Sequence, residues 1–280
     1  MESRKAPSPV CMENKPRCLR DVLSKMGRVA IALSGGIDSA FLLRVAAEVI
    51  PGRILALTAV SIFLPEDDLE NAKKIARQTQ TAHHLIDFDP LEVPHFAENP
   101  AERCYYCKKA LCRLFLNHAG NQGITNLIDG TNADDLQDFR PGLKAAAELS
   151  VRSPLSEANL TKAEIRALSQ QLGIPFWDKP SSPCLATRFP YGEPIVAEAV
   201  ERVKRAEGYL KSLGYNPVRV RSYRDTARIE TEAGQIGLFM EQDRTEHITG
   251  HLQELGFTYV TLDMEGYKSK SPCKSRNNVV

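Results

Sequence analysis

The sequence has no long hydrophobic run and no excess of charge of either sign. None of its 280 residues lies in a segment approaching the roughly 20 apolar residues of a membrane span, and the opening residues, MESRKAPSPVCMENKPRC, lack the apolar core of a signal peptide. Lys plus Arg number 36 and Asp plus Glu number 35, so no overall field attracts the chain to nucleic acid or to an anionic membrane. We therefore expect a cytoplasmic protein without a membrane partner, for which nucleic acid is a poor ligand.

The number and spacing of the cysteines do not suggest a disulfide framework. The chain has seven cysteines, an odd number, of which Cys104 and Cys107 form the one close pair with C-x-x-C spacing. In a reducing compartment this pattern favours metal, cluster or thiol chemistry over structural disulfides.

Short apolar segments alternate with amphipathic helical patterns through the first two thirds of the chain. The segments VAIAL, RILALTAV, HHLIDFD and NLIDGT each precede a helical or polar stretch. This alternation predicts the α/β class, a doubly wound parallel sheet with helices on both faces. Ligands of such sheets bind outside the carboxyl ends of the strands.

The order of elements changes after the Pro-rich loop PFWDKPSSPCLATRFPYGEP. Helix, strand, strand, helix and strand are expected in turn, with DRTEHITGHLQELG as the second helix. We therefore expect a smaller α+β C-terminal domain, and the sequence has no internal repeat. The predicted divisions are a flexible tail over residues 1–17, an α/β domain over 18–193, the second domain over 194–268 and a flexible tail over 269–280.

The stretch SGGIDS interrupts an apolar run with two glycines. Gly35 and Gly36 allow a sharp turn and a close approach of the backbone to a ligand, because neither has a Cβ. Asp38 and Ser39 then begin a helix whose free N–H groups and dipole attract an anion. A Walker-type loop would carry a lysine before its Ser or Thr, and none stands here. The alternative is an ordinary strand-to-helix turn in which Asp38 is only a cap.

A second polar stretch, LIDGTNADD, follows the predicted strand near residue 127. Its position at the carboxyl end of a strand is the edge where a nucleotide is expected. The alternative is a turn rich in Asn, Asp and Gly. The candidate nucleotide-binding residues in this stretch are Asp129, Gly130, Thr131, Asn132 and Asp134.

Three cysteines are candidates for one metal site. Cys104 and Cys107 would lie about 60° apart around a helix, so both thiols can reach one metal, and Cys184 is a candidate third ligand. Zinc would need a fourth ligand, whereas a three-cysteine iron-sulfur cluster leaves one iron open. The alternatives are a thioredoxin-like redox pair and inert buried thiols. Cys112 is a weaker candidate, and Arg188 is a cation that could activate Cys184, contact a phosphate or remain solvated.

The hexapeptide SGGIDS resembles the PP-loop of the ATP pyrophosphatase superfamily, whose fold is adenine nucleotide alpha hydrolase-like. That resemblance implies cleavage of ATP to AMP and pyrophosphate, with Mg²⁺ neutralising the phosphates. It also implies which residues bind ATP: Ser34, Gly35, Gly36, Asp38, Ser39, Gly130, Thr131, Asn132 and Asp134.

Over about residues 19–268 the sequence resembles the LarE family of ATP-dependent sulfur transferases. The resemblance rests on SGGIDS, RCYYCK, DGTNADDLQDFRPGLKAA, SPCLATRFPYGEPI and RAEGYLKSLG. It implies adenylation of a carboxylate of pyridinium-3,5-biscarboxylic acid mononucleotide and its conversion to a thiocarboxylate, for the nickel-pincer cofactor of lactate racemase. A homohexamer is also implied.

Within this family Cys184 matches the sulfur-bearing, catalytic position. In one branch that cysteine is consumed and becomes dehydroalanine, and in another three cysteines hold a 4Fe-4S cluster that delivers an added sulfide. The presence of Cys104 and Cys107 with Cys184 places this chain in the second branch. The positions implied to bind substrate are Arg188, Glu207, Arg219, Arg221 and Glu230, for which an exposed charged strand is the alternative.

Three other functions fit part of these observations. A PP-loop tRNA thiolase would use similar cysteines but needs a broad basic surface. A synthetase of the NAD or GMP type would use ammonia and would have no need of Cys184. A nucleotide sensor without catalytic activity would gain nothing from clustered thiols, so the sequence favours sulfur chemistry.

Overall fold

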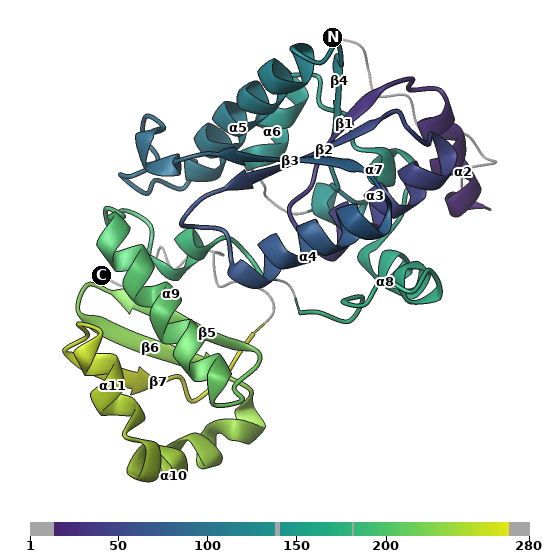
Figure 1. The fold of residues 1–280 in the computed structure, drawn as a ribbon. Helices are drawn as coiled ribbons and strands as arrows, with labels where there is room; N and C mark the ends of the chain where they lie inside the picture. Colours follow the sequence, from purple (N-terminus) through teal and green to yellow (C-terminus); the bar gives the residue numbers. More distant parts are fainter. Residues whose placement is uncertain (1–13, 138–140, 181, 269–280) are drawn as a thin grey trace. The chain divides into compact units, whose positions relative to one another are not determined.

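The computed structural model describes residues 14–137, 141–180 and 182–268 (Figure 1). The chain divides into two compact units, Met1–Ser182 and Pro183–Val280. Most of the predicted N-terminal tail and all of the predicted C-terminal tail lie outside the described residues, and the predicted domain boundaries stay predictions.

The first unit contains a four-stranded parallel sheet in the order β3-β2-β1-β4. Ile31 on the central strand pairs with Ala56 on one side and Ile128 on the other. The strand order reverses between β1 and β4, and such a reversal opens a crevice at the carboxyl ends of the strands. The strands are β1 (Val29–Ala32), β2 (Ile54–Val60), β3 (Ala82–Asp87) and β4 (Asn126–Ile128).

Helices cover both faces of this sheet, which confirms the predicted doubly wound α/β class (Figure 1). Val29 and Ile31 pack into one hydrophobic cluster with α3 and α4, whereas Ala30 and Leu57 belong to a second cluster with α5. Burial on both faces explains why the central strands β1 and β2 have no polar alternation. The helices are α2 (Lys15–Ser24), α3 (Ile37–Val49), α4 (Glu66–Gln78), α5 (Arg103–Gly120), α6 (Pro141–Glu148), α7 (Pro154–Glu157) and α8 (Lys162–Gln171).

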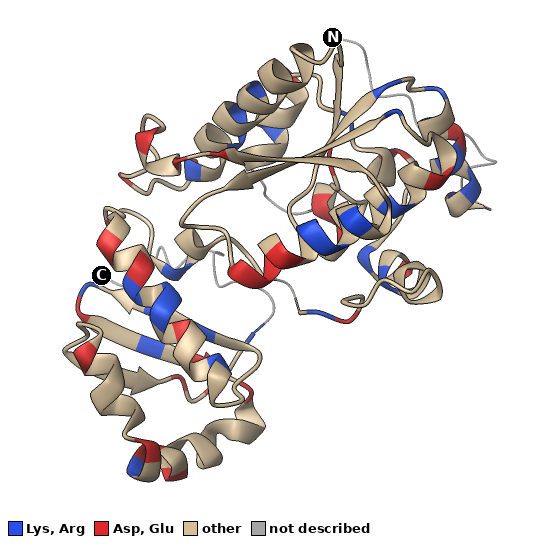
Figure 2. Ribbon diagram, in the orientation of Figure 1, with Lys and Arg blue, Asp and Glu red and all other residues tan. Residues whose placement is uncertain are grey.

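The helices α3, α4 and α8 differ in how their N-terminal turns are capped. α8 begins with a capping box in which Thr161 and Glu164 satisfy each other's backbone N–H groups. α3 begins after Gly36, which provides no side-chain cap, so its first N–H groups face outward for another acceptor. α4 carries three acidic residues in its first turn and basic residues further along, an arrangement that complements the helix dipole (Figure 2).

The second unit contains a three-stranded mixed sheet, as predicted for an α+β arrangement. Strand β6 pairs antiparallel with β5 and parallel with β7. The predicted single helix over DRTEHITGHLQELG is wrong, because His247 adopts a left-handed conformation (φ 51°) and separates two helices. The elements are α9 (Ala197–Ser212), β5 (Val218–Tyr223), β6 (Thr226–Thr231), α10 (Ile236–Glu246), α11 (Ile248–Glu254) and β7 (Tyr259–Leu262).

None of the helices in the described ranges is both long enough and apolar enough to cross a membrane.

Candidate functional site

The loop from Ser34 to Gly36 joins β1 to α3 and is fastened by the two serines. Ser34 N donates to Ser39 Oγ (3.2 Å), and Ser39 Oγ donates to the carbonyl oxygen of Gly36 (3.0 Å). Gly35 has φ +77°, and a Cβ there would lie 1.8 Å from the carbonyl oxygen of Asp68. Only glycine fits at that position, so the loop is a tight backbone cradle at the start of a helix.

The second predicted stretch lies against this cradle. A Cβ on Gly130 would lie 2.8 Å from the backbone nitrogen of Ser39. Beyond Gly130, Asn132 Oδ1 accepts from the backbone N–H groups of Asp134 (2.9 Å) and Asp135 (3.2 Å). The carboxyl ends of β1 and β4 thus bring both predicted ATP-binding stretches together.

Lys162, at the start of α8, connects the two stretches. Its Nζ donates to Asp38 Oδ2 and its backbone N–H donates to Asp134 Oδ2 (2.8 Å). Asp38 Oδ1 is buried and accepts no hydrogen bond from any described residue. A buried carboxylate oxygen without a donor is costly, and a magnesium ion or a donor brought by a nucleotide would satisfy it. The residues at this edge therefore fit a magnesium nucleotide.

Asp129 anchors the second stretch through a buried ion pair. Lys108 Nζ lies 2.9 Å from Asp129 Oδ2, and Ser153 Oγ donates to Asp129 Oδ1 (2.9 Å). Burial alone would raise the pKa of Asp129, but the charge of Lys108 and these hydrogen bonds lower it. Burial would likewise lower the pKa of Lys108, and the charge of Asp129 reverses the effect and raises it.

The four candidate cysteines differ in exposure. Cys104 is exposed and Cys107 half-buried on the first turn of α5, Cys184 is exposed, and Cys112 is buried. Cys104 and Cys107 belong to the first unit, and Cys184 belongs to the second. Within the described part of the chain, no three Cys, His, Asp or Glu side chains form a group that could hold a metal ion.

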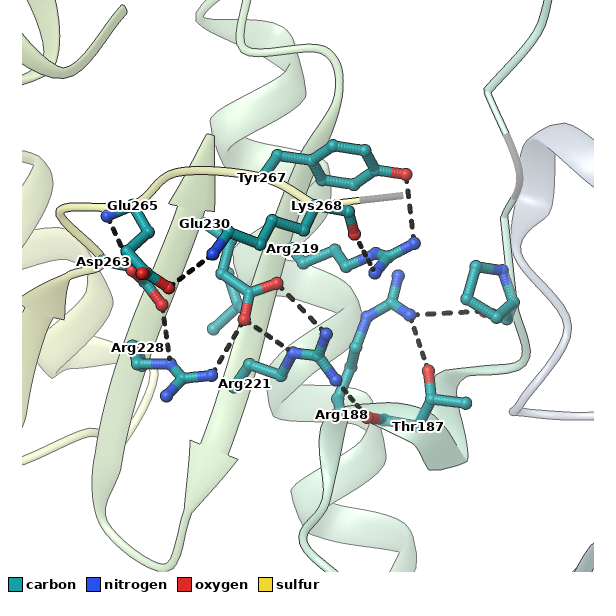
Figure 3. A network of polar contacts seen from close by, with 12 residues as sticks. Thr187, Arg188, Arg219, Arg221, Arg228, Glu230, Asp263, Glu265, Tyr267 and Lys268 are labelled. Carbon is teal, nitrogen blue, oxygen red and sulfur yellow. Dashed lines mark hydrogen bonds and ion pairs between the residues drawn. The ribbon is translucent and has the colours of Figure 1, made fainter. Parts of the chain in front are cut away.

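The second unit gathers the predicted substrate-binding residues on one face of its sheet. Arg219 and Arg221 alternate along β5 and are opposite Glu230 and Arg228 of β6. The Arg221 guanidinium makes a two-pronged contact with Glu230 (2.9 and 3.1 Å), and Arg228 donates to the same carboxylate (2.9 Å) (Figure 3). These side chains are held in place by one another.

A second buried pair attaches the Cys184 segment to this face. Arg188 makes a two-pronged contact with Glu207 of α9 (2.6 and 3.1 Å). Arg221 donates to the carbonyl oxygen of Thr187 (2.7 Å), and both the N–H and the hydroxyl of Thr187 donate to the carbonyl oxygen of Cys184 (2.9 Å each). Cys184 therefore directly precedes the short helix Leu185–Arg188, whose Thr187 contacts the arginine face of the same unit.

The sequence relationships agree with this geometry. A family model described as asparagine synthase matches residues 17–229. A protein of Lactiplantibacillus plantarum named pyridinium-3,5-bisthiocarboxylic acid mononucleotide synthase is 37% identical over 92% of this chain and 93% of its own length. The chain belongs to the LarE family of PP-loop enzymes.

Two further relatives cover nearly the same length. Uncharacterized protein slr1717 of Synechocystis sp. is 45% identical over 92% of this chain and 96% of its own length. Protein MJ0830 of Methanocaldococcus jannaschii is 29% identical over 88% of this chain and 92% of its own length. As a PP-loop enzyme the chain uses ATP with Mg²⁺, which the buried oxygen of Asp38 suits.

Sequence reasoning missed the cations that hold the PP-loop region. Lys162 pairs with Asp38, Lys179 with Asp68 (2.7 Å) and Lys108 with Asp129. The partners of Lys162 and Lys179 are more than one hundred residues away along the chain, so no local spacing could reveal them. A signal did exist for Lys162, which directly follows the Thr of a capping box at the start of α8.

Proposed function

We propose that this protein is an ATP-dependent sulfur transferase that converts the carboxylates of pyridinium-3,5-biscarboxylic acid mononucleotide to thiocarboxylates. The observation that carries this proposal is the 37% identity, over almost the whole of both chains, to a protein named as the synthase of the bisthiocarboxylic acid mononucleotide. The PP-loop and the arginine face supply a nucleotide site and an anion site to match.

The PP-loop residues would hold ATP while the carboxylate attacks it. A carboxylate oxygen attacks the α-phosphorus and pyrophosphate leaves, which makes the acyl carbon reactive because AMP is a good leaving group. The first N–H groups of α3, which has no side-chain cap, would donate to the phosphates. Ser34 and Ser39 hold the loop in shape, and Lys162 supplies positive charge at the same place. A sulfur nucleophile then attacks the acyl carbon and AMP departs with the carboxylate oxygen.

The substrate's own phosphate would bind on the arginine face of the second unit. Arg188 and Arg221 are already engaged by Glu207 and Glu230, so these four side chains form the frame of the site. Arg219 is the remaining buried arginine, and the described residues give it no carboxylate partner. We therefore assign the main contact with the substrate phosphate to Arg219.

For the sulfur source we propose a 4Fe-4S cluster bound by Cys104, Cys107 and Cys184. The support is the C-x-x-C spacing at the start of α5 together with a third exposed cysteine. Such a cluster would supply a place for an added sulfide donor. The remaining proposals are a cytoplasmic location, a homohexamer and a role in maturing lactate racemase.

Product analysis tests the proposed reaction. Full-length protein purified without air is incubated with ATP, Mg²⁺, sulfide and the biscarboxylic mononucleotide. We expect AMP and pyrophosphate in step with a product whose mass shows oxygen exchanged for sulfur. ADP with phosphate, or a product lacking sulfur, would exclude the proposed function.

Iron and acid-labile sulfide analysis tests the cluster separately. We expect iron in the wild type, its loss in Cys104→Ala, and loss of sulfur transfer in the same variant with ATP binding retained. Cys112→Ala is the matched control, a cysteine of the same helix that lies outside the proposed ligand set. If Cys104→Ala stays active and Cys184 loses the mass of hydrogen sulfide during turnover, the protein sacrifices its own thiol and the cluster proposal fails.

A further inference from the structure

The arginine face of the second unit carries one positive charge more than its carboxylates balance. Its cations are Arg188, Arg219, Arg221 and Arg228. Figure 3 shows Glu230 and Asp263 in contact with Arg221 and Arg228, and Glu207 of α9 contacts Arg188. The carboxylates contact every one of these arginines except Arg219. The excess charge is therefore located at Arg219.

Arg219 is enclosed by a segment that returns from the end of β7. Its side chain is only 2% exposed. Its NH2 group donates to the Tyr267 hydroxyl (3.0 Å) and its NH1 group donates to the carbonyl oxygen of Lys268 (3.3 Å). The guanidinium carbon also lies 4.5 Å from the centre of the Tyr267 ring, within the range of a cation–π contact.

These contacts orient the guanidinium without neutralising it. Both acceptors on Arg219 are neutral oxygens, and burial together with the nearby charges of Arg188 and Arg221 lowers the pKa of Arg219. A guanidinium has five N–H donors, of which the two hydrogen bonds use two. The other three have no acceptor among the described residues, and a phosphate needs two for a bidentate contact. Tyr267 thus leaves Arg219 able to bind a phosphate.

The Tyr267 segment is fixed by its backbone. Gly266 has φ +68°, and a Cβ there would lie 2.8 Å from the carbonyl oxygen of Thr231. Tyr267 N donates to the same carbonyl oxygen (2.6 Å). Since Tyr267 cannot shift without breaking this hydrogen bond to β6, its ring has a fixed position against the guanidinium of Arg219.

We propose that Tyr267 is a positioning residue for the substrate phosphate, acting through Arg219. The ring holds the guanidinium plane and the hydroxyl fixes its rotation, so that the remaining N–H donors face the ligand. The inference rests on the proposed function in its choice of substrate, but the anion site itself follows from the charges and contacts of the second unit.

Calorimetric titration of the full chain with inorganic phosphate tests the proposal directly. We expect Tyr267→Ala to weaken phosphate binding about tenfold and Tyr267→Phe, which keeps the ring, only two- to threefold. Tyr259→Ala is the control, a tyrosine 61% exposed on the neighbouring strand β7, and should bind phosphate like the wild type. Unchanged or tighter binding in Tyr267→Ala, or Tyr267→Phe no better than Tyr267→Ala, would overturn the proposal.

Kinetics with matched substrates separate positioning from folding. For the mononucleotide we expect Tyr267→Ala to raise KM about tenfold with kcat unchanged, and for the nucleoside that lacks the phosphate we expect no change. An equal effect on both substrates would show a structural role and overturn the proposal. If Tyr267→Ala does not fold, the test rests on Tyr267→Phe. Its loss of affinity should be smaller and confined to ligands that carry the phosphate. The two proposals can fail separately. If phosphate affinity falls from the wild type to Tyr267→Phe to Tyr267→Ala but the protein makes no thiocarboxylate, the proposed function is refuted and this inference stands.

Discussion

At the scale of single residues, the site is organised by charges whose partners are distant in sequence. Asp38 is held on one oxygen by Lys162, while its other oxygen is buried without a described donor. The sequence has no Walker lysine within SGGIDS, and the fold brings a lysine from α8 to the same loop instead. Lys162 therefore supplies the positive charge that the PP-loop itself lacks.

Substitution of Lys162 tests this role. We expect Lys162→Gln to lower the rate of AMP and pyrophosphate formation about a hundredfold, because removing one preorganised donor from a developing charge costs roughly that much. Lys15→Gln is the matched control, since Lys15 pairs with Glu164 on the same helix (2.8 Å). Pyrophosphate release is the measurement, and equal rates for Lys162→Gln and wild type would show that the ion pair is only structural.

The Lys108–Asp129 pair gives stability a defined pH dependence. The pKa of Asp129 is lowered below 3.8, so its contribution is complete above that pH and is lost as pH falls through the lowered value. The pKa of Lys108 is raised above 10.5, so its contribution is lost only at more alkaline pH. Asp129→Asn should cost about 2 kcal/mol near neutrality and make unfolding less sensitive to acid. Urea unfolding at pH 7 and at pH 3 measures both effects, and an equal loss at the two pH values would contradict this assignment.

At the scale of elements, the ends of β1 and β4 meet because the strand order reverses between them. Gly130 packs on the backbone of Ser39, and Gly35 packs on the backbone of Asp68 at the start of α4. Each glycine fits one loop against another element where no side chain has room. The proposed ATP cradle is therefore a property of three elements together, not of the hexapeptide alone.

Two glycines with similar backbone angles separate strain from crowding. Gly35 (φ +77°) would place a Cβ 1.8 Å from a carbonyl oxygen, whereas Gly52 (φ +73°) has no atom within 4 Å. Gly52→Ala should cost only the left-handed strain, about 1 kcal/mol. Gly35→Ala should cost at least about 3 kcal/mol and abolish ATP binding, because backbone must move. Thermal unfolding and ATP titration of both variants check this, and similar losses in the two would contradict the crowding argument.

The sequence predicts the elements well where burial sets the pattern, and less well where tertiary contacts decide. The strands around Ile31 could be predicted because both faces are buried and the apolar run is continuous. The break at His247 could not, since no glycine or proline stands there and the turn is a left-handed histidine. Arg188 and Glu207 could be expected from family resemblance, but their pairing depends on α9 packing against the short helix Leu185–Arg188.

At the scale of the whole molecule, the chain divides its chemistry between two units. The PP-loop, the stretch after β4 and the lysines that hold them all lie in the first unit. The arginine face, Tyr267 and Cys184 lie in the second. The pairs Lys162–Asp38 and Lys108–Asp129 each join two residues of the first unit, and the pairs Arg188–Glu207 and Arg221–Glu230 each join two residues of the second. We therefore expect a substitution in one site to leave these pairs of the other site intact.

A crossed pair of substitutions tests this division. Arg219→Ala removes the one arginine of its face without a described carboxylate partner, so we expect the KM for the mononucleotide to rise about a hundredfold while ATP binding is unchanged. Asp38→Ala should do the reverse, with ATP binding lost and phosphate binding to the second unit retained. Arg244→Ala, at an exposed position on α10, should change neither. Separate titrations with ATP and with inorganic phosphate measure both affinities in each variant. A loss of ATP affinity in Arg219→Ala equal to its loss of phosphate affinity would show that the units do not act independently.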